Sequence, residues 1–480
     1  PLVLVSGLAY GRVGSGFMPA MDEGGFVIDY RTPPGTSLTE TDRLLRQIEA
    51  IVRANPNVHT YSRRTGTQMG GGLTEANQGD FFIRLKSGPR EPIDQVMDEM
   101  RARVEHEVPG VDIEMMQLME DVIGDLTAVP QPIQVKIFSD DPEVLYASAR
   151  RVADALGKVA GVVDVRDGIN PAGDAIDIRV QPERAALEGV DPAWVAQALS
   201  DALSGNVAAQ VQQAPRMIGV RVWTPASTRD NDTALRTLLL RAPDGHLFPL
   251  ERVATLTAVS GQPQIESENL KRMVAVTARI SGRDLGSTIA DVKQVLRQPG
   301  LLGAGAYTAL GGLYQQQQIA FQGLMVVFAA AVALVFALLL FLYERFRIAA
   351  AVLLMPLLAV GAVFIGLWVT GIELNITSMM GMTMIVGIVT EVAIFYVSEY
   401  FLLREHEGMA LHEALLAAGA NRLRPIAMTT IAAILALLPL ALAIGQGSAM
   451  QQPLAVAIIT GLIVQMPLVL VVLPALMRLA

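Results

Sequence analysis

Five long apolar stretches follow one another closely in the last third of the chain. At a helical rise of about 1.5 Å per residue, each is long enough to cross a hydrocarbon core of roughly 30 Å. We predict membrane-spanning helices at 319–343, 348–370, 376–403, 425–447 and 453–477. The segment 319–480 is therefore predicted to be an all-α transmembrane domain.

A carboxylate, Glu391, stands in the middle of the third stretch. Such a charge costs about 2.5–3.5 kcal/mol on insertion scales, so it indicates a proton or ion pathway; the alternative is a headgroup position or a neutral packing role. Small and hydroxyl residues share its helical face: Thr383, Gly387 and Ser398, with Phe395 among them. These residues allow another helix to approach closely and offer hydrogen bonds. Burial favours the neutral acid and a nearby cation favours the carboxylate, so a conformational change that exchanges these surroundings would drive proton uptake and release.

The connectors between the apolar stretches predict the orientation. Arginines occur in the connectors 344–347 and 404–424 and at Arg478, whereas the connectors 371–375 and 445–452 contain neither Lys nor Arg. By the positive-inside rule the first set is cytoplasmic, so the large polar region lies outside the cytoplasm. The segment Ala410–Ala420 predicts a short amphipathic helix at the cytoplasmic surface.

Strand and helix patterns alternate through residues 17–318. We predict strands at 25–31, 79–85, 111–115, 133–138, 162–166, 174–180, 272–280 and 306–310, and helices at 41–54, 93–107, 142–159 and 286–296. Ser37 followed by Glu40 resembles a capping box at the first helix. Repeated strand–helix–strand units predict ferredoxin-like α+β subdomains. Residues 183–260 contain shorter strands and a turn at Ala242–His246, which indicates an inserted subdomain.

Composition limits the chemistry. The net charge is −9 and no long basic run occurs, which argues against a nucleic-acid partner. There are no cysteines, and the five histidines show no ligand spacing. Residues 1–16 begin at Pro1 with an apolar segment too short to span a membrane. We interpret this segment as the end of a truncated transmembrane helix, and the chain as part of a longer one.

Several motifs together resemble the resistance–nodulation–division (RND) efflux permeases, specifically their C-terminal half. They are GFMPAMDEGG at 16–25, PPGTSL at 33–38, NRLRPIAMTT at 421–430, LP at 438–439, QPLAVAIITG at 452–461 and LPAL at 473–476. The resemblance covers essentially the whole chain and is greatest to the heavy-metal-efflux-like branch. It implies a secondary active transporter driven by the proton gradient, with no cofactor and no enzymatic activity.

The resemblance also implies a domain plan. Residues 17–128 would form the first periplasmic porter subdomain, 129–181 with 261–318 the second, 182–260 a docking insertion, and 319–480 a five-helix transmembrane domain. The implied partners are the N-terminal half of the same permease, two further copies in a homotrimer, a periplasmic adaptor and an outer-membrane channel. The implied location is the bacterial inner membrane.

Three residues match positions of the family's proton relay: Glu391, Arg422 and Thr429. The alternative for Arg422 is an anchor at the cytoplasmic boundary, and for Thr429 a hydroxyl bonded to the helix backbone. The relay's acidic residues in the fourth helix belong to the N-terminal half, so the fragment alone is not expected to transport. Ile426 occupies the place of a lysine found in some copper exporters.

The sequence leaves two substrate classes open: metal ions and organic amphiphiles. Met115, Met116 and Met119 could offer thioethers to Cu(I), although methionines at this spacing are more often core residues. Asp121 and Asp125, with Glu120, could attract a divalent cation, although a solvated acidic face is commoner. An apolar cleft between the porter subdomains would suit an amphiphile.

Two other classes of function compete with transport. A sensor or assembly module with the same architecture would transport nothing and would not need Glu391. An enzyme would use Glu120, Asp121 and Asp125 as acid or base groups, but no catalytic triad or nucleotide loop accompanies them.

Overall fold

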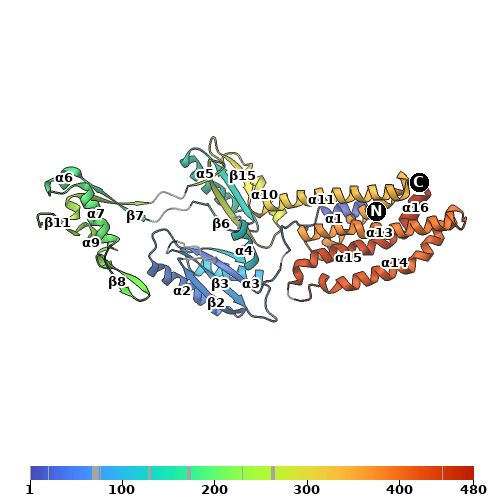
Figure 1. Cartoon of the computed structure of the whole chain (residues 1–480), viewed down its shortest axis with the longest axis horizontal. Coiled ribbons are helices and arrows are strands. Elements are labelled where there is room, and N and C mark those ends of the chain that lie inside the picture. Colours follow the sequence, from blue (N-terminus) through green and yellow to red (C-terminus); the bar gives the residue numbers. More distant parts are fainter. Residues whose placement is uncertain are drawn as a thin grey trace. The chain divides into compact units, whose positions relative to one another are not determined.

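The structure is a computed structural model that describes residues 2–19, 21–66, 75, 77–127, 131–169, 174–229, 231–260, 265–445 and 447–479 (Figure 1). The chain forms two compact units. Unit 1 contains Pro1–Ile169 and Ile265–Ala480, and unit 2 contains Asn170–Gln264.

The first α+β subdomain of unit 1 is ferredoxin-like. Its elements are β1 (Gly25–Arg31), α2 (Leu38–Ala54), β2 (Val58–Thr65), β3 (Gln78–Leu85), α3 (Ile93–Glu107), β4 (Asp112–Gln117) and α4 (Leu118–Thr127). The antiparallel sheet has the order β2-β3-β1-β4. Strand alternation places Phe26, Ile28 and Tyr30 in the core under α2 and α3, and Asp29 on the opposite face. The Ser37 hydroxyl accepts a 3.2 Å hydrogen bond from the Glu40 backbone N–H, which confirms Ser37 as the N-cap of α2.

The second α+β subdomain of unit 1 repeats this plan. Its elements are β5 (Ile133–Phe138), α5 (Pro142–Leu156), β6 (Val162–Arg166), β13 (Glu266–Glu268), β14 (Lys271–Ile280), α10 (Leu285–Leu296) and β15 (Tyr307–Gly311). The sheet has the order β13-β14-β5-β15, and β6 also pairs with β14. Helices α5 and α10 pack against the strands to form one core. The predicted ferredoxin-like α+β class is confirmed for both subdomains.

Unit 2 is the insertion. Its elements are β7 (Asp174–Val180), α6 (Pro182–Leu187), α7 (Pro192–Leu203), β8 (Asn206–Gln213), β9 (Arg216–Val222), α8 (Ala226–Arg229), α9 (Asp232–Arg236), β10 (Leu239–Arg241), β11 (Leu247–Pro249), η1 (Leu250–Arg252) and β12 (Ala254–Ser260). Strand β7 pairs with β12 from Val180–Ala254 to Asp174–Ser260. Strand β7 therefore folds with the insertion, although it was predicted to belong to the second porter subdomain.

The remaining elements of unit 1 form a helical bundle that holds both termini (Figure 1). They are α1 (Leu2–Tyr10), α11 (Gly312–Tyr343), α12 (Phe346–Thr370), α13 (Ile376–Glu405), α14 (Leu411–Ala441), η2 (Ser448–Gln451), α15 (Gln452–Pro467), η3 (Leu468–Val472) and α16 (Leu473–Leu479). Within the described residues, five helical segments are long and apolar enough to cross a membrane, as predicted. The predicted separate amphipathic helix at Ala410–Ala420 is wrong, because this Ala- and Leu-rich segment continues through Pro425 as the first turns of α14.

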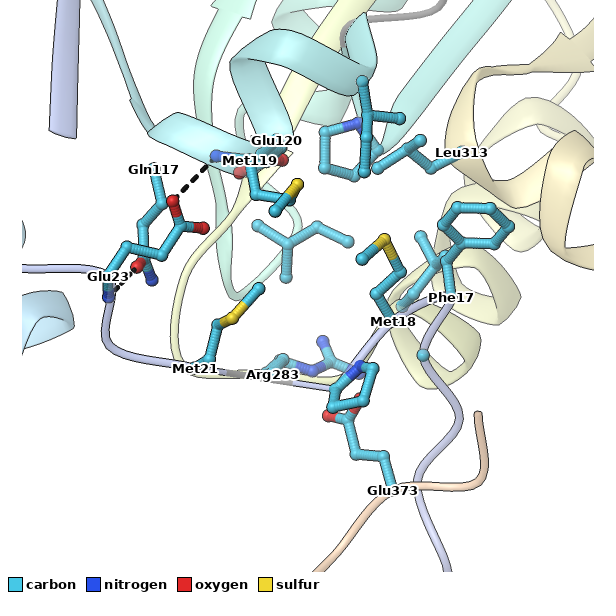
Figure 2. A pocket seen from close by; sticks show the side chains of 16 residues that line it. Phe17, Met18, Met21, Glu23, Gln117, Met119, Glu120, Arg283, Leu313 and Glu373 are labelled. Carbon is cyan, nitrogen blue, oxygen red and sulfur yellow. Dashed lines mark hydrogen bonds between the residues drawn. The ribbon is translucent and has the colours of Figure 1, made fainter. Parts of the chain in front are cut away.

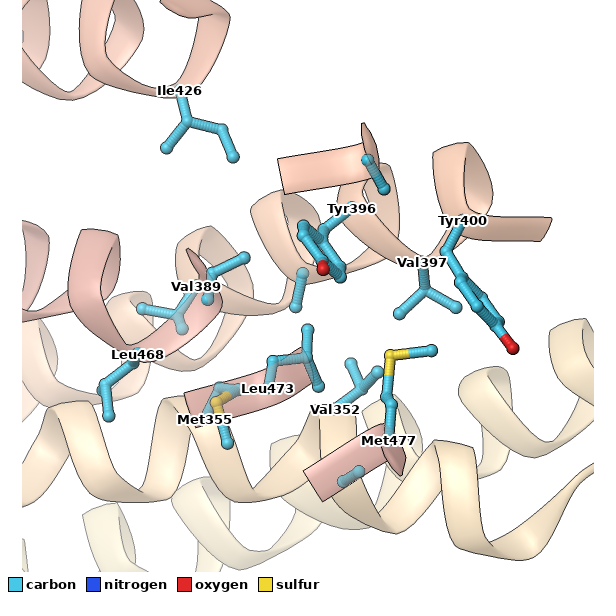
Figure 3. Close-up of a cluster of buried hydrophobic side chains, with 14 of the residues drawn as sticks. Val352, Met355, Val389, Tyr396, Val397, Tyr400, Ile426, Leu468, Leu473 and Met477 are labelled. Atoms are coloured by element: carbon cyan, nitrogen blue, oxygen red, sulfur yellow. The ribbon is translucent and has the colours of Figure 1, made fainter. Parts of the chain in front are cut away.

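Side chains from α12, α13 and the last helical segment fill the centre of the bundle. Figure 3 shows Met355, Val389, Tyr396 and Leu473 directed into this cluster. Gly461 lets α15 approach α13 closely, because a Cβ at this position would collide with the Ile385 side chain. The packing fixes the rotation of α13 about its axis, and thereby the direction in which Glu391 points.

Candidate functional site

Glu391 lies on the outward face of α13. Ala393 and Tyr396 are fully buried in the bundle core, so the helical period directs Glu391 away from it. The residues predicted to share this face are exposed, apart from the partly buried Thr383: Gly387, Phe395 and Ser398. This polar face of α13 is therefore open in the described chain.

A cavity of about 290 Å³ lies beside Glu391. Its walls come from α13, α14 and α15, and they include both other residues predicted for the proton relay, Arg422 and Thr429. The structure thus brings three residues from two helices to one cavity within the membrane-spanning bundle.

Three buried polar atoms line the same cavity without a hydrogen-bond partner among the described residues. They are Nε of Arg422, Oγ1 of Thr430 and Oε1 of Gln465. A buried polar group left without a partner costs about 1–3 kcal/mol, so such groups are normally satisfied by water or by another segment. The cavity is chemically suited to hold water next to a carboxylate in the bundle.

The charged partner of Arg422 is Glu399, two helical turns after Glu391. Nη2 of Arg422 donates to Oε2 of Glu399 at 2.8 Å, and the Asn421 amide donates to the other carboxylate oxygen at 2.8 Å. Glu399 was not among the predicted site residues, although it is a second carboxylate in the same apolar span. The hydroxyl of Thr429 donates to the carbonyls of Pro425 and Ile426, both at 3.1 Å, in the backbone-bonded arrangement considered as its alternative.

A second charged site lies between the two α+β subdomains of unit 1. Arg279 of β14 is 3% exposed, and its Nε lies 2.6 Å from Oε1 of Glu114 on β4. Its Nη1 lies 2.7 Å from Oε1 of Glu120, and Arg166 pairs with the other Glu114 oxygen at 2.9 Å. Burial alone would raise the pKa of Glu114, but Arg279 and Arg166 hold it below its usual value. Burial raises the pKa of Glu120 despite Arg279. No local sequence pattern predicts this network, because Arg279 and Glu114 are far apart in the chain.

The three candidate methionines do not converge. Met115 is 2% exposed and packs in the first subdomain's core, as expected for a core residue. Met116 points to the opposite face of the sheet, where its sulfur accepts a 3.0 Å hydrogen bond from Arg279. Met119 lies at the start of α4 and is 38% exposed. Strand alternation therefore directs Met115 and Met116 to opposite faces of β4, and the structure does not bring the three thioethers together.

The acidic candidates lie on α4. Asp121 is partly buried, and the side chain of Asp125 is outside the described part of the structure. Glu120 is held by Arg279 rather than free for acid–base chemistry. Within the described residues, no three His, Cys, Asp or Glu side chains are grouped so that they could hold a metal ion.

Proteins named for metal or drug resistance are similar in sequence to nearly the whole length of this chain. The cobalt-zinc-cadmium resistance protein CzcA of Cupriavidus metallidurans is 31% identical over 98% of this chain and 45% of its own length. The multidrug resistance protein MdtC of Erwinia tasmaniensis is 25% identical over 91% of this chain and 42% of its own length. The chain spans about half the length of the curated relatives it matches.

The fold of this chain is also similar to that of a solved structure. A crystal structure of a heavy metal efflux pump superposes with a TM-score of 0.86 at 27% identity, covering 99% of this chain and 50% of that one. The five apolar helices and these relatives make this a membrane protein. The AcrB/AcrD/AcrF family model matches residues 2–480, and the chain belongs to this family of RND permeases.

Proposed function

We propose that this chain is the C-terminal half of a proton-driven efflux permease of the bacterial inner membrane. One observation carries the proposal: Glu391 opens onto a cavity that also contains Arg422, Thr429 and unpaired buried polar atoms. A carboxylate with water-binding groups at membrane depth is the chemistry that a proton pathway needs. Heavy-metal and multidrug relatives support export of metal ions or small molecules.

Glu391 would exchange its proton when its surroundings change. An open cavity with water favours the carboxylate, whereas a helix packed on the exposed face of α13 would remove water and favour the neutral acid. Gly387 has no atom within 4 Å of the position that a Cβ would take, so this face can receive such a helix from the N-terminal half. The Arg422–Glu399 pair would hold α13 and α14 together at the cytoplasmic end of the cavity.

The remaining assignments follow from the family. The α+β subdomains and unit 2 would lie in the periplasm, and the permease would work as a homotrimer with an adaptor and an outer-membrane channel. The proton gradient would supply the energy without a cofactor.

The test uses the whole permease that contains this chain, in inverted vesicles with a fluorescent pH probe. Cu(I), Zn(II) and a panel of amphiphiles are presented to the wild type, to Glu391→Gln and to the control Glu405→Gln at the end of α13. We expect substrate-induced proton flux in the wild type and control and none in Glu391→Gln. Equal flux in all three removes Glu391 from the relay, and no flux with any compound favours a non-transporting sensor or assembly module.

A further inference from the structure

A groove lies between the first turns of α14 and the end of the last helical segment. Its cavity volume is about 460 Å³, within the range of about 300–1,000 Å³ that is typical of small-molecule sites. Helix α11 begins directly after β15 and each later span crosses the bundle in turn, so α14 begins and α16 ends at the bundle end away from β15. None of the groove residues lines the cavity beside Glu391. The groove is therefore a separate feature of the bundle.

The wall of this groove is apolar along most of its length. On α14, Leu415, Gly419 and Leu423 follow one another at intervals of four residues and share one face. Val471 and Ala475 come from the last helical segment, and their small side chains together with Gly419 leave the groove open. Leu423 and Val471 are exposed, so apolar carbon remains uncovered in the described chain. Hydrocarbon is a more favourable medium than water for such a wall.

Two basic side chains mark one end of the groove. His412 lies in the first turn of α14, and Arg478 lies in the last turn of α16. Neither makes a hydrogen bond or ion pair with any residue that the structure describes. No Asp or Glu lines the groove, whereas the pocket beside the start of α11, shown in Figure 2, is lined by Glu23, Glu120 and Glu373. The groove therefore offers positive charge and N–H donors to an anion.

The length of the groove matches one leaflet of a bilayer. From His412 to Leu423, α14 rises about 16 Å, and from Arg478 back to Leu470 the last helical segment covers about 12 Å. One leaflet has a hydrocarbon depth of about 15 Å, half of a core of roughly 30 Å. A headgroup at the basic end would therefore place an acyl chain along the whole apolar wall.

A simpler role for Arg478 is that of an interfacial anchor, with its side chain directed to the headgroup layer. An anchor of this kind needs neither a second basic side chain on another helix nor a cavity below it. Here His412 supplies the second basic group, and the apolar cavity lies between the two helices. Basic pockets between membrane-spanning helices are a recognised setting for anionic lipid headgroups.

We propose that this groove binds one anionic phospholipid. Its phosphate would lie at Arg478 and His412, and an acyl chain would lie between α14 and the last helical segment. In the orientation proposed above, the lipid belongs to the cytoplasmic leaflet, whose surface is negatively charged. The bound lipid would join the start of α14 to the end of α16. This site is independent of the transported substrate and of Glu391.

The test uses the whole permease that contains this chain, in detergent, with native mass spectrometry to count the lipids bound to each protomer. We expect the wild type to bind phosphatidylglycerol more tightly than phosphatidylcholine with the same acyl chains. Arg478→Gln removes one cation from the headgroup site, so it should weaken phosphatidylglycerol binding about fivefold and leave phosphatidylcholine binding unchanged. The control Arg404→Gln alters another exposed arginine at the same bundle end, outside the groove, and should bind as the wild type does.

A second pair of variants tests the apolar part of the groove. Ala475→Phe fills the space between the helices and should weaken the binding of both lipids. The control Ala432→Phe adds the same ring at an exposed position of α14 outside the groove and should bind both lipids normally. Glycerol phosphate, which has the anionic group without acyl chains, should not displace phosphatidylglycerol.

Four results would overturn the proposal. They are equal binding of the two lipids by the wild type, unchanged phosphatidylglycerol binding in both Arg478→Gln and Ala475→Phe, displacement by glycerol phosphate, and a wild-type permease that retains no phosphatidylglycerol. Displacement would make the groove a site for soluble phosphates, and the absence of lipid would assign it to a segment of the N-terminal half. Binding is measured without substrate or a proton gradient, so the outcome is independent of the Glu391 flux test.

Discussion

Removal of Arg279 should disturb the contact between the two α+β subdomains. Arg279 is 3% exposed and ion-paired with Glu114 at 2.6 Å and with Glu120 at 2.7 Å. In Arg279→Leu these carboxylates lose a buried partner, and breaking a buried pair typically costs about 3–5 kcal/mol. Glu114 keeps Arg166 and the Gln131 amide, so we expect the lower end, about 3 kcal/mol.

Hydrogen–deuterium exchange of β4 and β14 measures this loss, because local opening sets the protection of these strands. A loss of about 3 kcal/mol should speed exchange roughly 150-fold, since 1.4 kcal/mol corresponds to a factor of ten. The control is Arg103→Leu, which breaks the exposed Arg103–Glu107 pair and should leave the exchange of β4 and β14 close to that of the wild type. The double variant Arg279→Leu/Glu114→Leu should recover part of the protection. The reasoning is refuted if Arg279→Leu exchanges like the control.

Three further predictions concern single side chains. Burial raises the pKa of Asp29 to about 7, so its contribution to stability is fully present below the ordinary aspartate pKa of 3.8, declines as the pH rises, and is lost above about 7. At pH 8, Asp29→Asn should therefore have a higher melting temperature than the wild type and be more stable by up to about 4 kcal/mol. At acidic pH, where residue 29 is neutral in both proteins, the two should melt at the same temperature. Hydrogen bonds to Asp244 and Glu188 raise the pKa of His246. The protonated side chain therefore stabilises unit 2 fully below the ordinary histidine pKa, and this stabilisation is lost above the raised pKa. His246→Gln should flatten the pH dependence of hydrogen exchange in unit 2. Gly461→Ala should destabilise the bundle by about 1–3 kcal/mol in thermal melts, because its Cβ collides with Ile385, while Gly387→Ala should leave the melt of this chain unchanged.

Much of the fold follows from local patterns. The strands β5, β6 and β7 and helix α3 begin and end where the sequence predicts, because apolar periodicity and turn residues mark both ends. Strand β2 was missed because its sequence, VHTYSRRT, is mostly polar and lies at the sheet edge. The pairing of β7 with β12 joins segments far apart in the chain, so the strand was predicted but its partner was not.

The functional site, too, was predictable only in part. Glu391 was predictable because it is an isolated charge in an apolar span, and its neighbours on the helix follow from the 3.6-residue period. Arg279 carried no such signal, since its partner Glu114 belongs to another subdomain. The separation of Met115 from Met116 required knowing that their segment is a strand, where alternate side chains point to opposite faces.

The central claim is that Glu391 carries the proton. Infrared difference spectroscopy on the whole permease, recorded with and without a transported substrate, detects protonation of a single carboxylate directly. We predict a substrate-induced carboxylic-acid band in the wild type that is missing in Glu391→Gln and retained in Glu405→Gln. A band that persists in Glu391→Gln, alongside normal proton flux, would contradict the account.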